Sequence, residues 1–373
     1  MKRAYSDLKS FFKDRKVIII YGARRIGKTT LLENYLKTCE KKYKFVSGDD
    51  ILIQEVLSSS NIQKITEFCQ NYELLVIDEA QNIPNIGQCL KIIVDHVPNL
   101  QVIATGSSSF DLANKVGEPL VGRKVVLTMF PLSQKELSYE FNPYELKQNL
   151  EDYLIYGAYP EVLTLSNKQD KIQYIKEIVG SYLYKDILSF CDIKNPLMLN
   201  RLTKLLAFQI GSEVSFNELS NNLGIDVKTV SKYLDLLEKS FIIYKLTGYS
   251  GNLRNEINKK HKYYFVDNGI RNAVISQFNA LEDRNDVGEL WENFILMERI
   301  KKNTYDFSYV NSYFWRTYTK DEVDYVEESD GNLHGFEFKW GVHAKAKTAA
   351  FLKEYTQATI TTINKENYLS FAT

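Results

Sequence analysis

The sequence predicts an α/β protein in which a parallel sheet comes first, a helical region follows, and a smaller α/β domain ends the chain. Over residues 1–130, apolar strand-like runs alternate with helical stretches, as they do in a parallel sheet with crossover helices. From about residue 285, a long amphipathic helix precedes strands joined by an Asp-Gly turn. These two observations set the fold class.

The length supports several domains, because 373 residues exceed what one common core accommodates. Hydrophobic residues make up 44% of the chain and charged residues 25%, as in folded soluble proteins. Changes of pattern predict four segments: a sheet domain at 1–135, a helical, lid-like region at 136–210, a winged helix-turn-helix at 211–270 and a final α/β domain at 285–373.

Composition also bears on location and partners. No run of eighteen apolar residues and no apolar leader occurs, so we expect a cytoplasmic protein without a membrane partner. Cys39, Cys69, Cys89 and Cys191 are scattered without a CxxC pair, which favours buried thiols over a disulfide framework. The formal net charge is zero, so binding of nucleic acid would depend on a local basic patch.

The first strand, "KVIIIYG", leads into the strongest motif, "GARRIGKTT". It matches GxxxxGK[ST] between a β-branched strand and a helix, the context in which backbone N–H groups cradle phosphate oxygens. We expect Lys28 to reach the β- and γ-phosphates of ATP and the Thr29 hydroxyl to bind Mg²⁺. The predicted nucleotide-binding residues are Gly22, Ala23, Arg24, Arg25, Ile26, Gly27, Lys28, Thr29 and Thr30.

A later apolar strand, in "ELLVIDEAQNI", ends in the two acids Asp78 and Glu79. Ligands of open parallel sheets bind at this end of the strands. We expect Asp78 to hold Mg²⁺ through water, and Glu79 to orient or deprotonate the attacking water. Two acids after a strand are commonly loop residues, but the phosphate loop about fifty residues upstream makes a catalytic pair the better interpretation.

The next strand, "LQVIATGSSS", ends in the hydroxyls of Thr105, Ser107 and Ser108. A hydroxyl at this edge of the sheet is placed to sense the γ-phosphate, and we select Ser107 for that role. Short hydroxyl-rich loops also occur without any such function.

These motifs, together with the later "LVGRKVVLTMFPLS", resemble the AAA-type ATPases. More narrowly, nearly the whole chain is similar to a prokaryotic family that joins such a P-loop ATPase to a winged helix and a nuclease-like C-terminal domain. In that family Gly-Arg recurs before the "PLS" segment, and here it is Gly122-Arg123. The resemblance implies ATP hydrolysis. It also implies that Arg123 contacts a γ-phosphate as an arginine finger, in its own subunit or in a neighbour of a homo-oligomer. The alternative is a surface arginine in a loop.

In the segment 211–270, "SFNELSNNLGIDVKTVSKYLDLLEKSFII" reads as two helices around a Gly224 turn, and two strand-like runs around a polar loop follow as a wing would. Between Asp226 and Lys262 there are eight Lys or Arg and four Asp or Glu, a net charge of +4. This predicts DNA phosphate contacts, and the alternative is a module for protein or oligomer contacts. The predicted contact residues are Lys228, Thr229 and Lys232 in the second helix and Arg254, Lys259 and Lys260 in the wing.

Near the end of the chain, "EVDYVEESDGNLHGFEFKW" contains Asp330-Gly331, a favoured two-residue hairpin turn. The register around this turn places Asp324 opposite Glu337, and Lys339 extends from the same face. The other, apolar face is predicted to hold Val323, Tyr325, Phe336 and Phe338.

Two carboxylates opposite each other, about 5 Å apart at Cβ, repel unless a cation lies between them. This favours a second Mg²⁺ or a Mn²⁺ bound by Asp324 and Glu337, with Lys339 acting on the attacked phosphate or on water. The pattern resembles the PD-(D/E)xK nucleases, and the resemblance adds Glu292, in "GELWENFILMERI", as a ligand from a helix. The alternative is a solvated hairpin in which Lys339 forms a surface ion pair with Glu322.

Two function classes follow from these patterns. In the first, ATP hydrolysis drives action on nucleic acid, including metal-dependent DNA cleavage. In the second, the chain is an ATP-gated switch whose C-terminal domains bind proteins and cleave nothing.

Overall fold

The computed structural model describes residues 1–107, 120–182, 195–250, 261–317, 319, 321–342 and 349–373. They divide into two compact units. The N-terminal unit comprises Lys2–Phe130 with Lys239–Phe241, and the C-terminal unit comprises Met1, Pro131–Glu238 and Ile242–Thr373. The predicted fold class, an α/β protein with an N-terminal parallel sheet, is confirmed.

The N-terminal unit is built on five strands in the order β2-β3-β4-β1-β5, and every pairing is parallel. Each strand coincides with one of the predicted apolar runs. The strands are β1 (Val17–Tyr21), β2 (Tyr43–Ser47), β3 (Leu74–Asp78), β4 (Gln101–Gly106) and β5 (Lys124–Thr128). The helices are η1 (Leu8–Phe11), α1 (Lys28–Lys37), α2 (Ile51–Leu57), α3 (Ile62–Cys69), η2 (Ala80–Asn82) and α4 (Ile86–His96).

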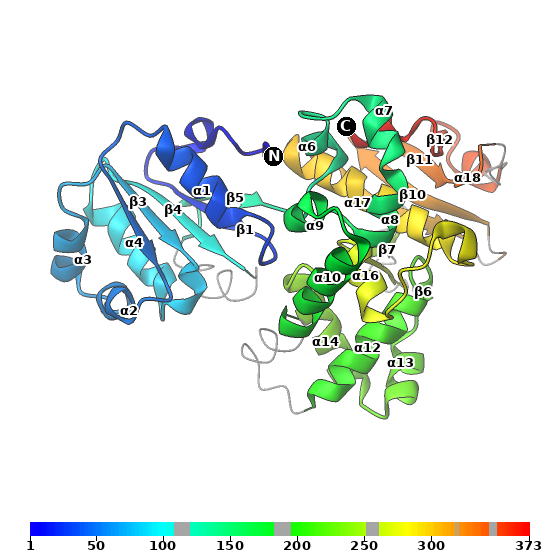
Figure 1. Ribbon diagram of the computed structural model, residues 1–373, viewed down its shortest axis with the longest axis horizontal. Coiled ribbons are helices and arrows are strands. Elements are labelled where there is room, and N and C mark those ends of the chain that lie inside the picture. The colour runs from blue at the N-terminus through cyan, green and yellow to red at the C-terminus, as the bar shows by residue number, and fades with distance from the viewer. Residues whose placement is uncertain (108–119, 183–194, 251–260, 318, 320, 343–348) are drawn as a thin grey trace. The chain divides into compact units, whose positions relative to one another are not determined.

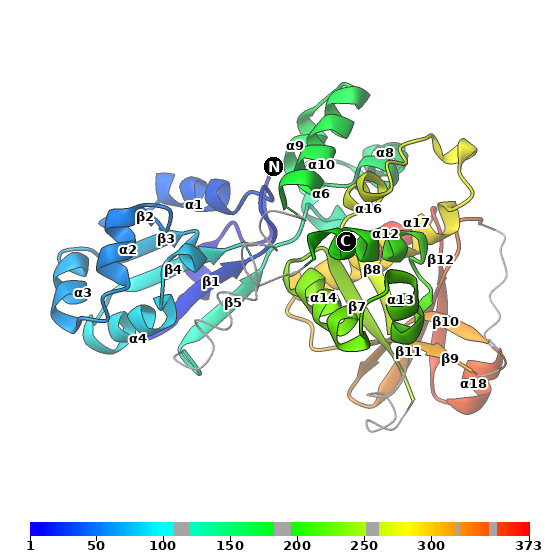
Figure 2. The same ribbon diagram turned by 90° about the horizontal axis from the view of Figure 1, so that it is seen from below.

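Burial in this sheet follows the strand order. The inner strands β1 and β3 are buried along their whole length, whereas the edge strands β2 and β5 are partly exposed. Val17, Ile19 and Tyr21 point into a core shared with α3 and α4, and α1 covers the opposite face, as Figure 2 shows. Because the strands are parallel, the loops after β1, β3 and β4 meet at the same end of the sheet, next to the last residues of these strands.

The C-terminal unit contains a seven-stranded sheet in the order β12-β11-β10-β9-β7-β8-β6 (Figure 1). The strands are β6 (Glu213–Val214), β7 (Ile243–Gly248), β8 (His261–Phe265), β9 (Asn311–Arg316), β10 (Glu322–Ser329), β11 (Asn332–Phe338) and β12 (Thr359–Ile363). The helices before β6 are α6 (Gln134–Leu137), α7 (Pro143–Gln148), α8 (Leu150–Tyr156), α9 (Pro160–Thr164), α10 (Lys168–Tyr182) and α12 (Pro196–Phe208). Those after it are α13 (Phe216–Leu223), α14 (Val227–Lys239), α16 (Asn268–Val274), η3 (Leu281–Asp283), α17 (Val287–Tyr305), α18 (Ala349–Glu354) and α19 (Tyr368–Ala372).

The predicted segments 211–270 and 285–373 share this one sheet. Strand β7 pairs with β9 in parallel, through Thr247 with Tyr313 and Gly248 with Phe314, and so joins the strands of the two segments. Apart from Lys239–Phe241, the segments 136–210, 211–270 and 285–373 lie within one compact unit, and sheet hydrogen bonding continues from the second of them to the third.

The two helices expected around Gly224 are α13 and α14, and Gly224 between them is left-handed (φ 65°). The helix expected from about residue 285 is α17, whose buried residues lie on every side of the helix and not on a single stripe. It packs against β8 and β11 as well as α8, α16 and α19, which explains why an amphipathic pattern was the wrong expectation.

The hairpin register is confirmed from Ser329–Asn332 to Tyr325–Phe336. Nearer the start of β10 the strand is irregular, because a β-bulge interrupts its pairing with β9 between Val323 and Val326. Val323 consequently packs with Val326 and Phe351, not on the face of Tyr325 as predicted. A bulge reverses which face a strand residue occupies.

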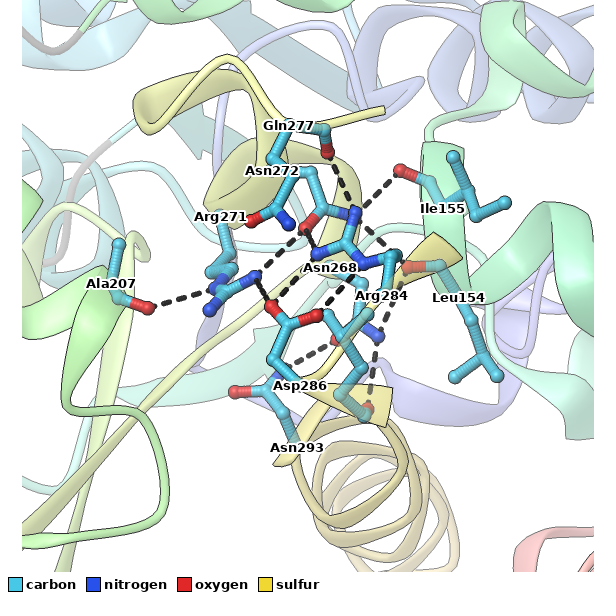
Figure 3. A network of polar contacts seen from close by, with 11 residues as sticks. Leu154, Ile155, Ala207, Asn268, Arg271, Asn272, Gln277, Arg284, Asp286 and Asn293 are labelled. Carbon is cyan, nitrogen blue, oxygen red and sulfur yellow. Dashed lines mark hydrogen bonds and ion pairs between the residues drawn. The ribbon is translucent and has the colours of Figure 1, made fainter. Parts of the chain in front are cut away.

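A buried polar network, shown in Figure 3, joins α8, α16 and the start of α17. Arg271 and Arg284 both form ion pairs with Asp286. Asn272 donates to the backbone oxygens of α8, and Asn268 donates to that helix and to α17. Because the charges and amides satisfy each other, these helices are held at fixed positions in the C-terminal unit.

Within the described residues, Cys39, Cys69 and Cys89 are free thiols, and Cys191 lies outside them. Burial raises the pKa of Cys69 to about 11 and that of Cys89 to about 12, so both are protonated thiols at neutral pH. Among the helices of the described part, none is long and apolar enough to cross a membrane.

Candidate functional site

The phosphate loop connects β1 to α1, as predicted. Gly27 is left-handed (φ 93°) immediately before the helix, a conformation that favours glycine. A Cβ on Gly22 would lie 2.3 Å from the Met129 backbone oxygen, so only glycine fits there. Ala23 and Ile26 are buried in the core, whereas Arg25, Thr29 and Thr30 are exposed and Arg24 is half-buried.

Lys28 folds back onto this loop. Its ammonium donates to the Gly22 and Ala23 backbone oxygens, both at 2.9 Å. Burial lowers the pKa of Lys28 to about 8, although the Glu79 and Asp78 carboxylates oppose this shift. The loop therefore holds a desolvated cation on two of its carbonyl oxygens, and a phosphate oxygen is the natural replacement for them.

Asp78 ends β3 between two hydroxyl groups. Its Oδ2 accepts a 2.7 Å hydrogen bond from the Thr29 hydroxyl, and its Oδ1 accepts one from the Thr105 hydroxyl of β4. Thr29 and Asp78, predicted to hold Mg²⁺, are thus in direct contact. A hydroxyl and a carboxylate are oxygen ligands of the kind that Mg²⁺ takes, so these residues fit that ion.

Glu79 adopts a left-handed conformation (φ 48°) directly after the strand. Its N–H donates to the Thr105 hydroxyl at 3.1 Å. Its carboxylate accepts a hydrogen bond from the Gln81 side-chain amide, and the same amide donates to the Ser107 hydroxyl at 3.2 Å. The predicted base and the predicted phosphate sensor are therefore joined through Gln81.

Sequence reasoning missed Gln81 and chose Ser107 over Thr105 as the hydroxyl of interest. The available signals were a polar residue two positions after the acid pair and a hydroxyl inside an otherwise apolar strand. Ser108 lies outside the described residues.

Arg123 lies at the opposite end of the sheet, beside the first residue of β1. Its backbone oxygen accepts from the N–H of Val17, the first residue of β1, whereas the phosphate loop follows the last residue of that strand. The five residues of β1 separate these two ends by roughly 16 Å. The side chain pairs with Asp95 at 3.0 Å. An arginine finger within the same subunit was therefore a wrong expectation, because the strand direction carries Arg123 away from the loop.

The predicted DNA-contact residues are partly described. Lys228 and Lys232 are exposed on α14. Thr229 donates its N–H and its hydroxyl to Asp226, at 2.9 and 2.6 Å, which caps the start of the helix. Arg254, Lys259 and Lys260 lie outside the described residues.

In the C-terminal unit, a cavity of about 450 Å³ collects the predicted metal-site residues. Its charged lining residues are Lys262, Glu289, Glu292, Asp321, Glu322, Asp324, Glu337 and Lys339. The Lys339 ammonium lies 2.8 Å from Glu337 Oε2 and 3.4 Å from Asp324 Oδ2. Lys339 thus pairs with these two carboxylates, whereas Glu322 contacts Lys262 and Arg316.

Glu337 is only 3% exposed, and its Oε1 has no hydrogen-bond partner among the described residues. Burial and the neighbouring Asp324 charge raise the pKa of Glu337 to about 7. Lys339 therefore contacts one of the two carboxylate oxygens of Glu337, and the other has no partner at the cavity wall.

Glu292, on α17, is held from two sides. The Tyr264 hydroxyl donates to its Oε1 at 2.7 Å, and the Lys262 ammonium lies 3.3 Å from the same atom. Burial raises the pKa of Glu292 to about 7, with Lys262 opposing the shift and Asp324 adding to it. Lys262 and Tyr264 were missed by sequence reasoning, although a lysine inside the apolar run "HKYYF" was a visible signal.

Among the residues that the structure describes, no three His, Cys, Asp or Glu side chains are grouped so that they could hold a metal ion. The cavity carboxylates Asp324, Glu337, Glu292 and Glu322 are instead in contact with the ammonium groups of Lys339 and Lys262. A second metal in the C-terminal unit is therefore not shown.

Comparison with known families divides the chain into three parts. Residues 14–138 match a family model described as an AAA domain. Residues 147–281 and 287–369 match two families, each described as a domain of unknown function (DUF8612 and DUF4143). The border between the latter two falls inside the polar network of Figure 3.

Similar proteins occur in bacteria and archaea. An uncharacterized protein of Haemophilus influenzae is 26% identical over 325 residues, covering 78% of this chain and 76% of that protein. One from Mycobacterium tuberculosis is 26% identical over 333 residues, covering 87% and 70%. One from Methanocaldococcus jannaschii is 24% identical over 303 residues, covering 76% and 66%.

Solved structures show more distant similarity. A Walker-type ATPase of Pyrococcus abyssi aligns at a TM-score of 0.47 and 14% identity, covering 73% of this chain and 94% of that one. The RuvB Holliday junction branch migration motor of Thermotoga maritima aligns at 0.32 and 16%, covering 65% and 85%. At these TM-scores neither structure informs the function of this chain. The AAA-domain match and the phosphate loop agree: residues 14–138 are similar to AAA domains, and the phosphate loop before α1 lies among them.

Proposed function

We propose that the N-terminal unit binds ATP with Mg²⁺ and hydrolyses it. One observation carries the proposal. Asp78 is held between the hydroxyls of Thr29 and Thr105, with Lys28 and Glu79 beside it, at the edge of the sheet where the phosphate loop begins. A carboxylate, a hydroxyl, a cation and a second carboxylate at one strand edge are the groups that phosphoryl transfer requires.

Each residue then has a chemical role. Lys28 exchanges its two carbonyl contacts for phosphate oxygens, and Thr29 with Asp78 would hold Mg²⁺, which supplies charge neutralisation at the phosphates. Glu79 accepts a proton from water while the water oxygen bonds to the γ-phosphorus. The bond from that phosphorus to the β–γ bridging oxygen breaks, and ADP and phosphate leave. Ser107 would donate a hydrogen bond to the γ-phosphate.

The test compares nucleotide binding with turnover. Lys28→Ala should abolish ATP binding, whereas Glu79→Gln should preserve binding and reduce kcat by at least about a hundredfold. Lys37→Ala and Glu33→Gln are matched controls, because both residues are exposed on α1. Unchanged ATP affinity in Lys28→Ala would refute the assignment.

As a second candidate function, we infer that the C-terminal unit binds DNA. The order α12, β6, α13, α14, β7, β8, with β8 antiparallel to both β6 and β7, is that of a winged helix, and this supports the inference. Lys228 and Lys232 are exposed on the helix that would face DNA. The competing role for the same elements is protein contact within an ATP-gated switch.

A salt titration separates these roles. If α14 grips phosphates, Lys228→Ala with Lys232→Ala should weaken binding to every DNA sequence and reduce the slope of log affinity against log salt by roughly one to two. Lys204→Ala, exposed on α12, is the control. No binding by the wild type at low salt would favour protein contact.

DNA cleavage with a second Mg²⁺ or Mn²⁺ is the finer proposal for this unit. Asp324, Glu337 and Lys339 lie together on one cavity with Glu292, and the unpartnered Glu337 oxygen favours a cation there. Mn²⁺-dependent nicking by the wild type that is lost in Asp324→Ala with Glu337→Ala would support this proposal. Equal Mn²⁺ affinity of the two proteins would refute it.

A further inference from the structure

The cavity lined by Glu292, Asp324 and Glu337 also contains Lys262, a lysine that a metal site does not require. It lies on β8 and is only 1% exposed, although it carries a charge. Its ammonium forms an ion pair with Glu322 and lies 3.3 Å from Glu292. The Phe314 ring covers it, with its centroid 5.3 Å from the nitrogen. A buried ammonium is stable only while its carboxylates remain beside it.

The two lysines of the cavity divide four of its carboxylates between them. Lys339 takes Asp324 and Glu337, whereas Lys262 takes Glu292 and Glu322. Lys339 is 29% exposed at its side chain, so it can turn into solvent and release its two carboxylates. Lys262 has no such path, because its side chain is enclosed.

The Glu292 carboxylate is held in place by contacts that include Lys262. The Tyr264 hydroxyl and the Lys262 ammonium both contact its Oε1. A Cβ placed on Gly211 would lie 3.1 Å from the same oxygen, so the backbone closes in from another side. A divalent ion bound by Glu292 would stand within a few ångströms of the buried ammonium, and like charges at that distance repel strongly.

We propose that Lys262 is a resident cation that keeps Glu292 from binding a divalent metal, so that Asp324 and Glu337 alone hold Mg²⁺ or Mn²⁺, weakly. The inference rests on the proposed metal site and states how that site is limited. Removing the Lys262 charge converts the cavity into a tighter site with Glu292 as a further ligand.

The experiment measures Mn²⁺ binding to the full chain without nucleotide, by the electron paramagnetic resonance signal of free Mn²⁺. Lys262→Met should lower the dissociation constant at least tenfold relative to the wild type. Lys262→Arg retains the charge and should leave it unchanged. An equal dissociation constant in Lys262→Met and the wild type overturns the proposal.

Two further variants keep the outcomes distinct. Adding Asp324→Asn and Glu337→Gln to Lys262→Met should remove the gained binding, and persistence of that binding would sink the metal site itself. Because Lys262→Met removes the cation that Glu292 and Glu322 share, Lys262→Gln with Glu322→Gln serves as a variant without that excess negative charge. It should also bind Mn²⁺ more tightly than the wild type and melt at a higher temperature with Mn²⁺. Wild-type affinity in this folded variant overturns the role of Lys262.

Discussion

Thr105 holds the acid pair in place, and Thr105→Val tests how much this matters. The side chain is fully buried, its hydroxyl donates to Asp78 Oδ1, and it accepts from the Glu79 N–H at 3.1 Å. Valine has nearly the same shape, so the substitution removes two hydrogen bonds while leaving little cavity.

The magnitude follows from those two bonds. A hydrogen bond to a charged carboxylate contributes about 1.5–3 kcal/mol, and a buried N–H left without an acceptor costs about 1–3 kcal/mol. The added valine methyl returns about 0.8 kcal/mol through burial. We therefore expect the free energy of unfolding of the N-terminal unit to fall by about 2–5 kcal/mol, and ATP turnover to fall with it because Asp78 loses its orientation.

The assay uses the distribution of tryptophan. The chain has three, and Trp291, Trp315 and Trp340 all lie in the C-terminal unit. In urea, tryptophan fluorescence follows that unit, whereas far-ultraviolet circular dichroism follows both. Thr105→Val should lower the urea midpoint of the N-terminal unit, which only dichroism reports, and leave the midpoint measured by fluorescence unchanged.

The matched control is Thr203→Val in the C-terminal unit. Thr203 is equally buried, but its hydroxyl donates only to the Leu199 backbone oxygen of its own helix, so we expect a loss below about 1 kcal/mol. Thr105→Ser should restore most of the stability. A Thr105→Val loss no larger than that of Thr203→Val, with full turnover, would refute the reasoning.

Three further predictions concern the same unit. Gln81→Ala removes the donor that joins Glu79 to Ser107, so kcat should fall about tenfold with ATP affinity unchanged in steady-state kinetics, and equal kcat would contradict this. Because Arg123 cannot reach its own phosphate loop, Arg123→Ala and Lys28→Ala proteins should each be inactive and recover turnover when mixed, if the chain is an oligomer with fingers between subunits. Failure to recover would leave Arg123 a surface residue bound to Asp95. The lowered pKa of Lys28, about 8, means that the unfolded chain holds this proton more tightly, so its contribution to stability rises with pH between about 8 and 10.5. Lys28→Met should lose that rise in urea unfolding measured against pH, and an identical pH profile would argue against the buried charge.

Local motifs were predictable because the residues that form them are close in sequence. The phosphate loop needs a strand, glycines at two positions and a helix start, and all of these occur within a few residues of Lys28. The Asp330-Gly331 turn set the hairpin register for the same reason, since a two-residue turn fixes which residues face each other. The same argument failed at Val323, where the bulge depends on the distant strand β9.

The sequence by itself determined which chemical groups end the strands of a parallel sheet, and therefore that Lys28, Asp78 and Glu79 meet at one edge. Only the tertiary structure decided which edge each remaining residue occupies and which cations accompany the carboxylates. Arg123 was separated from the loop by the direction of β1, and Lys262 was brought to Glu292 by the packing of β8 on α17. The physical reason is that strand order and helix packing minimise the free energy of the whole core, and no short stretch of sequence encodes that sum.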